Sequence, residues 1–116
     1  MTLDNLTEIL KTDTPSIEIK RNEKEIFDLI PELELCKGFN QNNEWHPYDV
    51  YEHTLHVVDN VENDEILRMS ALFHDLGKPE TYTEDEYGVG HFYGHWKISK
   101  RIFNDFAIEN NIDIKK

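Results

Sequence analysis

The stretch of sequence that decides the fold is SALFHDLGK, residues 70–78. It begins as an almost apolar run, which is typical of a helix that packs into a core. Gly77, followed by Pro79, predicts that this helix ends here. His74 and Asp75 therefore stand side by side at a helix end, and both side chains can bind a metal ion. Burying two ionisable groups behind an apolar run costs free energy unless they are paired or bind a metal.

A simpler interpretation of His74 and Asp75 is a hydrogen-bonded pair or a helix cap. Neighbouring residues on a helix point about 100° apart, so they do not normally share a ligand. They can share one where the helix is ending and the ion lies across its face. The pair by itself leaves both interpretations open, and the rest of the sequence has to decide between them.

Apolar residues recur at helical spacing on both sides of this stretch. Thr2 or Asp4 can cap a first helix, Asn22–Glu25 has the spacing of a capping box, and Asn63-Asp64 can cap a later helix. The pattern predicts helices over residues 3–10, 22–31, 50–61, 64–77 and about 92–108, a linker over 12–16, a turn at 33–35 and a loop or small hairpin over 81–90. We therefore expect an all-α fold, a compact bundle of about five helices.

Composition limits the class of protein. The chain has 116 residues, 38% of them hydrophobic, and a formal net charge of −12. This length suits one domain over residues 1–116, with a ligand-bearing core at about 46–106. Cys36 is the single cysteine, so no intramolecular disulfide can form. The sequence contains neither a signal-peptide core nor the roughly 20 apolar residues of a membrane span, so we expect a cytoplasmic protein without membrane partners.

The negative charge also bears on partners. An acidic surface repels phosphate backbones, so general nucleic-acid binding is not expected. A small phosphorylated ligand is compatible with it, because a divalent cation outweighs nearby carboxylates at its own site.

Six histidines are spread over separate expected helices and the adjoining loops. They are His46, His53, His56, His74, His91 and His95. Imidazole and carboxylate together suit divalent transition metals, so a fold that brings these elements together can build a metal site. His91 and His95 share one helical face if the last helix already includes His91.

The order of these motifs resembles the HD superfamily of metal-dependent phosphohydrolases. The resemblance lies in HTL at 53–55 within a helix and HDLGK at 74–78 at a helix end. The HD domain of bacterial tRNA nucleotidyltransferases, the CCA-adding enzymes, is more similar still. Its segments match WHPYDVYEHTL at 45–55, KPET at 78–81 and GHFYGH at 90–95, and the likeness covers roughly residues 25–106.

The resemblance implies a role for each matching residue. The implied metal ligands are His53, His74, Asp75, His91 and His95, and the implied catalytic residues are Asp75, Lys78, His91 and His95. Asp75 would also bridge to a second ion or orient a nucleophilic water, and Lys78 would contact the substrate phosphate. His91 and His95 would complete a second metal position or bind phosphate. The cofactor would be a divalent ion, one of Mn, Ni, Co, Mg, Fe or Zn.

Two parts of the family pattern are not identified in this sequence. The superfamily pattern ends with an Asp on a later helix, and Asp105 follows His95 too closely to fit it. The nucleotidyltransferase head, with its paired-Asp strand motif, does not precede the domain. Nucleotide addition is therefore not expected.

The sequence thus predicts a metal-dependent phosphohydrolase acting on a nucleotide, a cyclic phosphate or another small phosphoester. The alternative is a non-catalytic HD module that binds metal or nucleotide and docks to a partner protein, because the ligand set is incomplete. A purely structural helical domain is a third interpretation, and a homodimer could supply the missing ligand. We expect Trp45 and Trp96 to pack in the core or at its rim, and Lys97, Lys100 and Arg101 to form a solvated helix face.

Overall fold

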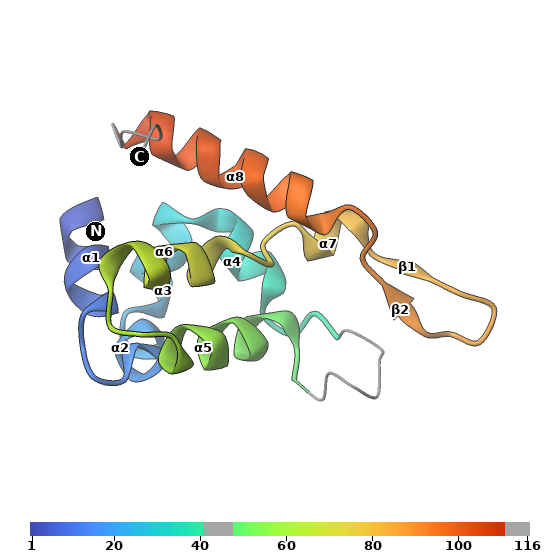
Figure 1. Cartoon of the computed structure of the whole chain (residues 1–116), viewed down its shortest axis with the longest axis horizontal. Helices are drawn as coiled ribbons and strands as arrows, with labels where there is room; N and C mark the ends of the chain where they lie inside the picture. Colours follow the sequence, from blue (N-terminus) through green and yellow to red (C-terminus); the bar gives the residue numbers. More distant parts are fainter. Residues whose placement is uncertain (41–47, 111–116) are drawn as a thin grey trace.

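Helices dominate the computed structural model of the chain, which describes residues 1–40 and 48–110 (Figure 1). In chain order the helices are α1 (Leu3–Leu10), α2 (Pro15–Arg21), α3 (Glu23–Leu29), α4 (Pro31–Cys36), α5 (Val50–Asn60), α6 (Glu65–Phe73), α7 (Lys78–Thr81) and α8 (His95–Glu109). Strands β1 (Thr83–Glu84) and β2 (Gly90–His91) form a small antiparallel hairpin between α7 and α8. The expected all-α class is confirmed, and so is a hairpin before the last helix.

The linker expected over residues 12–16 is shorter than predicted, because α2 already begins at Pro15. Proline is well suited to the first position of a helix, where its missing N–H is not needed. Ser16 then fixes the start of α2 against α5: its N–H and its hydroxyl donate to the carboxylate of Asp59 at 2.9 and 2.6 Å. The short linker therefore leads straight into the helical body.

The capping box expected at Asn22 does not form. The side-chain amide of Asn22 instead donates to the carbonyl of Glu18, at 2.9 Å, and so ends α2. The turn expected at residues 33–35 is also wrong, because these residues lie in α4, which starts at Pro31. The first part of the chain is thus four short helices, where fewer and longer ones were expected.

Two longer helices, α5 and α6, lie side by side in the middle of the molecule, and α5 also packs on α2 and α4. Both begin where the sequence predicts, since Asp49 caps α5 and Asp64 caps α6 through their carboxylates. Leu55 and Leu72 lie in the apolar core, and each is at most 1% exposed. This packing holds the helix that carries His53 against the end of α6.

A buried arginine joins α6 to the start of the chain. The guanidinium of Arg68 donates to the carbonyls of Leu10 and Thr12 at 2.7 and 2.6 Å. Leu10 is the last residue of α1, where helix geometry leaves carbonyls without partners, and Thr12 lies two residues beyond it. Arg68 therefore satisfies both carbonyls and ties α1 to α6.

The last helix lies along one side of the molecule, packed on α6 and α7, and the hairpin extends beyond the helical body where α8 begins (Figure 1). The expected start of this helix, at about residue 92, is wrong. Gly94 has a φ of +76°, in the left-handed region that favours glycine, and the helix begins only at His95. His91 lies on β2, so His91 and His95 do not share a helical face.

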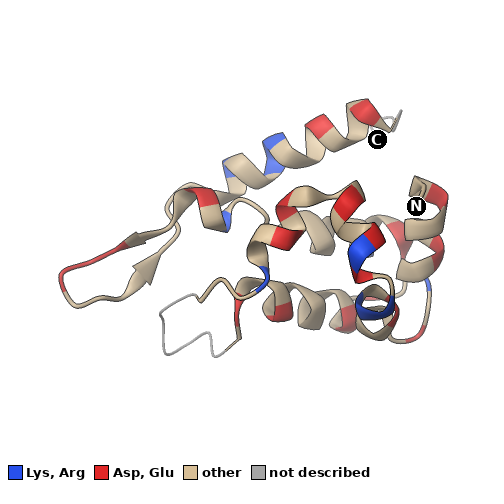
Figure 2. Ribbon diagram, turned by 180° about the vertical axis from the view of Figure 1, so that it is seen from behind, with Lys and Arg blue, Asp and Glu red and all other residues tan. Residues whose placement is uncertain are grey.

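Acidic side chains are spread over most helices, while the basic residues of α8 gather in its first half (Figure 2). In the part of the chain that the structure describes, no helix is both long and apolar enough to cross a membrane.

Candidate metal centre

The His-Asp pair lies in the turn between α6 and α7. Helix α6 ends at Phe73, and the N–H of Leu76 donates back to the Phe73 carbonyl at 3.2 Å. The next turn follows at once, because the N–H of Lys78 donates to the carbonyl of Asp75 at 3.0 Å. Two successive turns allow the neighbouring side chains of His74 and Asp75 to reach one point.

Gly77 brings this turn against α8. A Cβ atom at this position would lie 2.4 Å from the carbonyl oxygen of His95 and 2.7 Å from the nitrogen of Ser99. These are main-chain atoms, so they cannot move aside as the end of a flexible side chain can. Glycine is therefore required here for close approach, which places the first turn of α8 next to Asp75.

Three imidazole rings converge on the Asp75 carboxylate. The Nε2 atoms of His53 and His74 each lie 3.0 Å from Oδ2 of Asp75. The Nε2 atom of His95 lies 3.1 Å from the other oxygen, Oδ1. One ligand atom from each of His53, His74 and Asp75 lies within 4.8 Å of the others, which is close enough to hold one metal ion. Asp75 is buried, and the histidines are partly exposed on the open side.

The hydrogen bonds of the other ring nitrogens indicate which atoms carry protons. Nδ1 of His74 lies 2.5 Å from the carbonyl oxygen of Ala71, and Nδ1 of His95 lies 3.0 Å from that of Phe92. A carbonyl only accepts, so Nδ1 is the protonated nitrogen in both rings. In a neutral ring Nε2 is then an acceptor, and it faces a carboxylate, which is also an acceptor. A cation between them, a proton or a metal ion, is what makes this geometry favourable.

The charges of the cluster shift its pKa values in opposite directions. Burial alone would raise the pKa of Asp75, but hydrogen bonds from His53 and His74 and the charge of Lys78 outweigh it and hold that pKa well below its usual range. Burial alone would lower the pKa of His74, but the hydrogen bond and charge of Asp75 outweigh it and raise that pKa. Without a metal, the cluster is therefore an ion pair over a range of acidic pH.

Lys78, expected at the substrate phosphate, is only 6% exposed. Its Nζ lies 3.4 Å from Oδ2 of Asp75 and 5.1 Å from the centre of the Phe92 ring. An ammonium ion over an aromatic face is stabilised by the ring quadrupole, which lowers the cost of burying it. Lys78 thus faces Asp75 from the protein side of the cluster.

His91, expected as a ligand, lies elsewhere. Its Nε2 is 2.9 Å from Oδ2 of Asp85, and its ring stacks on Tyr93 with centroids 5.2 Å apart. His91 thus forms its contacts within the hairpin, whereas His53, His74 and His95 face Asp75. Asp105 is exposed on α8 and is not one of the grouped ligands, so among residues 1–40 and 48–110 no further carboxylate joins the group at His53, His74 and Asp75.

Two partners of the site escaped the sequence analysis. Ser99 accepts a hydrogen bond from the Gly77 N–H at 2.8 Å, and the ring of Phe92 covers Lys78. Neither contact has a local signal, because Ser99 and Phe92 come from another part of the chain and meet the turn only in the folded structure. Trp45 and His46, part of the motif before α5, lie outside the described residues.

The fold and the cluster together define a helical domain with a histidine-aspartate group that could hold a metal ion. The chain belongs to the HD domain family, whose pattern matches residues 44–116. No solved structure gives a significant match to it.

The curated relatives are longer proteins. The chain is 32% identical over 84 residues to the A-adding tRNA nucleotidyltransferase of Deinococcus radiodurans. The matched region makes up 66% of this chain and 19% of that protein. The chain is 38% identical over 79 residues to the CC-adding tRNA nucleotidyltransferase of Thermus thermophilus, 63% of this chain and 18% of that one. With the Multifunctional CCA protein of Psychromonas ingrahamii it shares 33% identity over 104 residues, 84% of this chain and 25% of the other. The chain thus spans a quarter or less of these relatives.

Proposed function

We propose that this domain is a metal-dependent phosphohydrolase that acts on a nucleotide, a cyclic phosphate or another phosphoester. The observation that carries the proposal is the convergence of His53, His74 and His95 on the buried carboxylate of Asp75. A cluster with this many nitrogen and oxygen donors around one point suits a divalent transition metal.

The residues present fit such an ion. His53, His74 and Asp75 would hold it through two imidazole nitrogens and one carboxylate oxygen. Three protein ligands are typical of catalytic sites, in which a position stays open for water or substrate. A divalent ion bound here would supply Lewis-acid chemistry, lowering the pKa of water and polarising a phosphoryl oxygen.

The remaining residues of the cluster have separate tasks. His95 lies on the far oxygen of Asp75, with its proton held on Nδ1 by the carbonyl of Phe92. Its Nε2 can take a second proton, and the ring can then stabilise negative charge on a phosphoryl group or donate that proton to the leaving alkoxide. The buried ammonium of Lys78 helps to keep Asp75 ionised, as a metal ligand must be.

The test is an assay of the purified protein with Mn²⁺, Ni²⁺, Co²⁺ or Mg²⁺ against p-nitrophenyl phosphate and 2′,3′-cyclic nucleotides. We expect turnover that is lost in His74→Ala and Asp75→Ala. His56→Ala is the matched control, since His56 is exposed on α5, the helix of His53, and stacks on Tyr48 instead of facing Asp75. If wild type and both site variants are equally inert with every ion, the domain is not a phosphohydrolase.

A second candidate is a non-catalytic HD module that binds metal or nucleotide and docks to a partner protein. It is favoured by the position of Asp105, which is exposed on α8 and leaves the described ligand group without the final Asp of the pattern. Nucleotide binding with no turnover under any ion would support this function. A homodimer that supplies the missing ligand from a second copy is a variant of either function, and light scattering tests it.

A further inference from the structure

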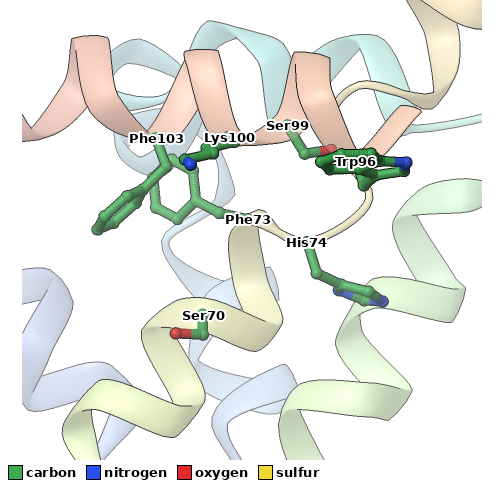
Figure 3. A pocket seen from close by; sticks show the side chains of 7 residues that line it. All are labelled: Ser70, Phe73, His74, Trp96, Ser99, Lys100 and Phe103. Atoms are coloured by element: carbon green, nitrogen blue, oxygen red, sulfur yellow. The ribbon is translucent and has the colours of Figure 1, made fainter. Parts of the chain in front are cut away.

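An open cavity of about 280 Å³ lies between α6 and α8, directly beside the metal centre (Figure 3). Its lining residues are Ser70, Phe73, His74, Trp96, Ser99, Lys100 and Phe103. Pockets for whole drug-sized ligands start at roughly 300 Å³, so this cavity suits one ring system with its nearest substituents.

The cavity and the metal centre share His74. His74 is one of the residues that line the cavity, and Nε2 of its ring lies 3.0 Å from Oδ2 of Asp75. In Figure 3, Trp96 and His74 lie at one end of the cavity and Phe103 at the other. A ligand anchored at the metal centre therefore needs to extend past only one imidazole ring to enter the cavity.

The walls are aromatic and the rim is polar. Phe73, Phe103 and Trp96 supply rings, and Trp96 is 62% exposed, which is unusual for so large an apolar side chain. Lys97 lies 5.4 Å from the centre of the Trp96 ring, so its charge already polarises that ring. Lys100 forms no salt bridge with any residue in the described segments, and its ammonium stands at the cavity. Aromatic walls with few polar groups are the usual composition of a small-molecule site.

From this arrangement we infer that the cavity receives the planar aromatic group of the phosphoester whose phosphate lies at the metal centre, and that Trp96 is a specificity-determining residue. The heteroaromatic base of a nucleotide is a group of this kind. The inference deepens the proposed function, because it adds a substrate class to the same site. It also assigns Trp96 a stacking role, although the sequence favoured packing.

The experiment compares AMP with ribose 5-phosphate, which carry the same primary phosphoester and differ in the base. Binding to the Mn²⁺-loaded protein is measured by calorimetry, and kcat/KM is measured for both. We expect wild type to prefer AMP by about tenfold, since stacking of a base on an aromatic side chain accounts for roughly five- to a hundredfold in affinity. Trp96→Ala should abolish the preference and leave ribose 5-phosphate within about twofold of wild type. Trp96→Phe should retain most of it.

Two further variants separate a local effect from a general one. Tyr87→Ala removes an aromatic ring that is 82% exposed at the tip of the hairpin, and it should leave the preference for AMP intact. Ser70→Phe fills the cavity from α6 without touching Trp96, and it should abolish the preference as Trp96→Ala does. Circular dichroism and bound Mn²⁺ show that each variant is folded.

The outcomes distinguish this inference from the proposed function. Equal binding of both ligands by wild type, or an equal loss of both in Trp96→Ala, overturns the aromatic pocket even if both are hydrolysed. A Trp96-dependent preference for AMP without hydrolysis of either ligand overturns the phosphohydrolase and leaves the pocket standing.

Discussion

The main-chain N–H of Gly77 donates a hydrogen bond to the hydroxyl of Ser99 at 2.8 Å, and this bond joins the turn that carries His74 and Asp75 to the first part of α8. Both groups are buried, so the bond is shielded from competing water. This hydrogen bond matters because it helps to position His95. His95, one turn before Ser99, reaches Asp75 only if α8 lies this close to the turn.

Gly77→Ala tests that closeness. The new Cβ would lie 2.4 Å from the His95 carbonyl oxygen, so α8 has to shift and take His95 away from Asp75. Overpacking of this kind costs about 1–3 kcal/mol, and we expect a clearly lower Tm together with weaker metal binding. Gly88→Asn is the control, because Gly88 has open space around it and asparagine tolerates its positive φ. An unchanged Tm for Gly77→Ala would contradict the close contact.

Metal binding should depend on the three grouped ligands and not on the hairpin histidine. Mn²⁺ at 100 times its Kd should stabilise the wild type by about 2.7 kcal/mol, because the ion binds only the folded chain. We expect this stabilisation to vanish in His53→Ala and His74→Ala and to persist in His91→Ala, whose ring pairs with Asp85. Thermal unfolding with and without Mn²⁺ provides the measurement. Loss of the effect in His91→Ala would place that residue at the metal after all.

The metal-free cluster should give a stability maximum at mildly acidic pH. The folded pKa of Asp75 is depressed, so its contribution is present above the unfolded value of 3.8 and is lost as the pH falls below it. The folded pKa of His74 is raised, so its contribution is full below the unfolded value of 6.5 and is lost as the pH rises through the folded pKa. The pH range in which both contributions stabilise the fold therefore lies between about pH 4 and pH 6.5.

This pH range is measured as the difference in Tm between wild type and Asp75→Asn in EDTA across pH. Added Mn²⁺ should extend the advantage of the wild type to higher pH, since the ion binds neutral imidazole. A difference that does not change with pH would show that the cluster does not titrate as described.

Cys36 should be unreactive in the native protein. Burial, reinforced by the negative charges of Asp75 and Asp49, raises the pKa of the Cys36 thiol to about 12. Since the thiolate is the nucleophile, a disulfide reagent at neutral pH should modify the chain only when it unfolds. The rate should then follow the unfolded fraction as urea is added, and fast modification without urea would show that this part of the core opens readily.

The sequence predicted the position of the His-Asp pair at a helix end better than it predicted the helix boundaries. His74 and Asp75 stand out locally because two ionisable residues follow an apolar run, and such a signal does not depend on the rest of the fold. The boundaries at Pro15 and Asn22 depend on contacts with Asp59 and Glu18, and helical periodicity does not report on those contacts.

The expected metal ligands show the same difference between what the sequence reports and what the fold decides. The family pattern placed His53 at the site, and the structure brings it to Asp75. His91 was expected beside His95 because they are four residues apart, yet Gly94 adopts a positive φ between them and starts the helix late. Spacing assumes regular backbone, so it fails where a glycine changes the direction of the chain.

The carbonyls of Ala71 and Phe92, which hold the Nδ1 protons of His74 and His95, belong to the main chain. Every amino acid has the same main-chain carbonyl group. Substitutions at positions 71 and 92 can therefore change side-chain packing without removing the groups that set the tautomers. Both imidazoles thus stay ready to bind a cation whatever side chains occupy positions 71 and 92.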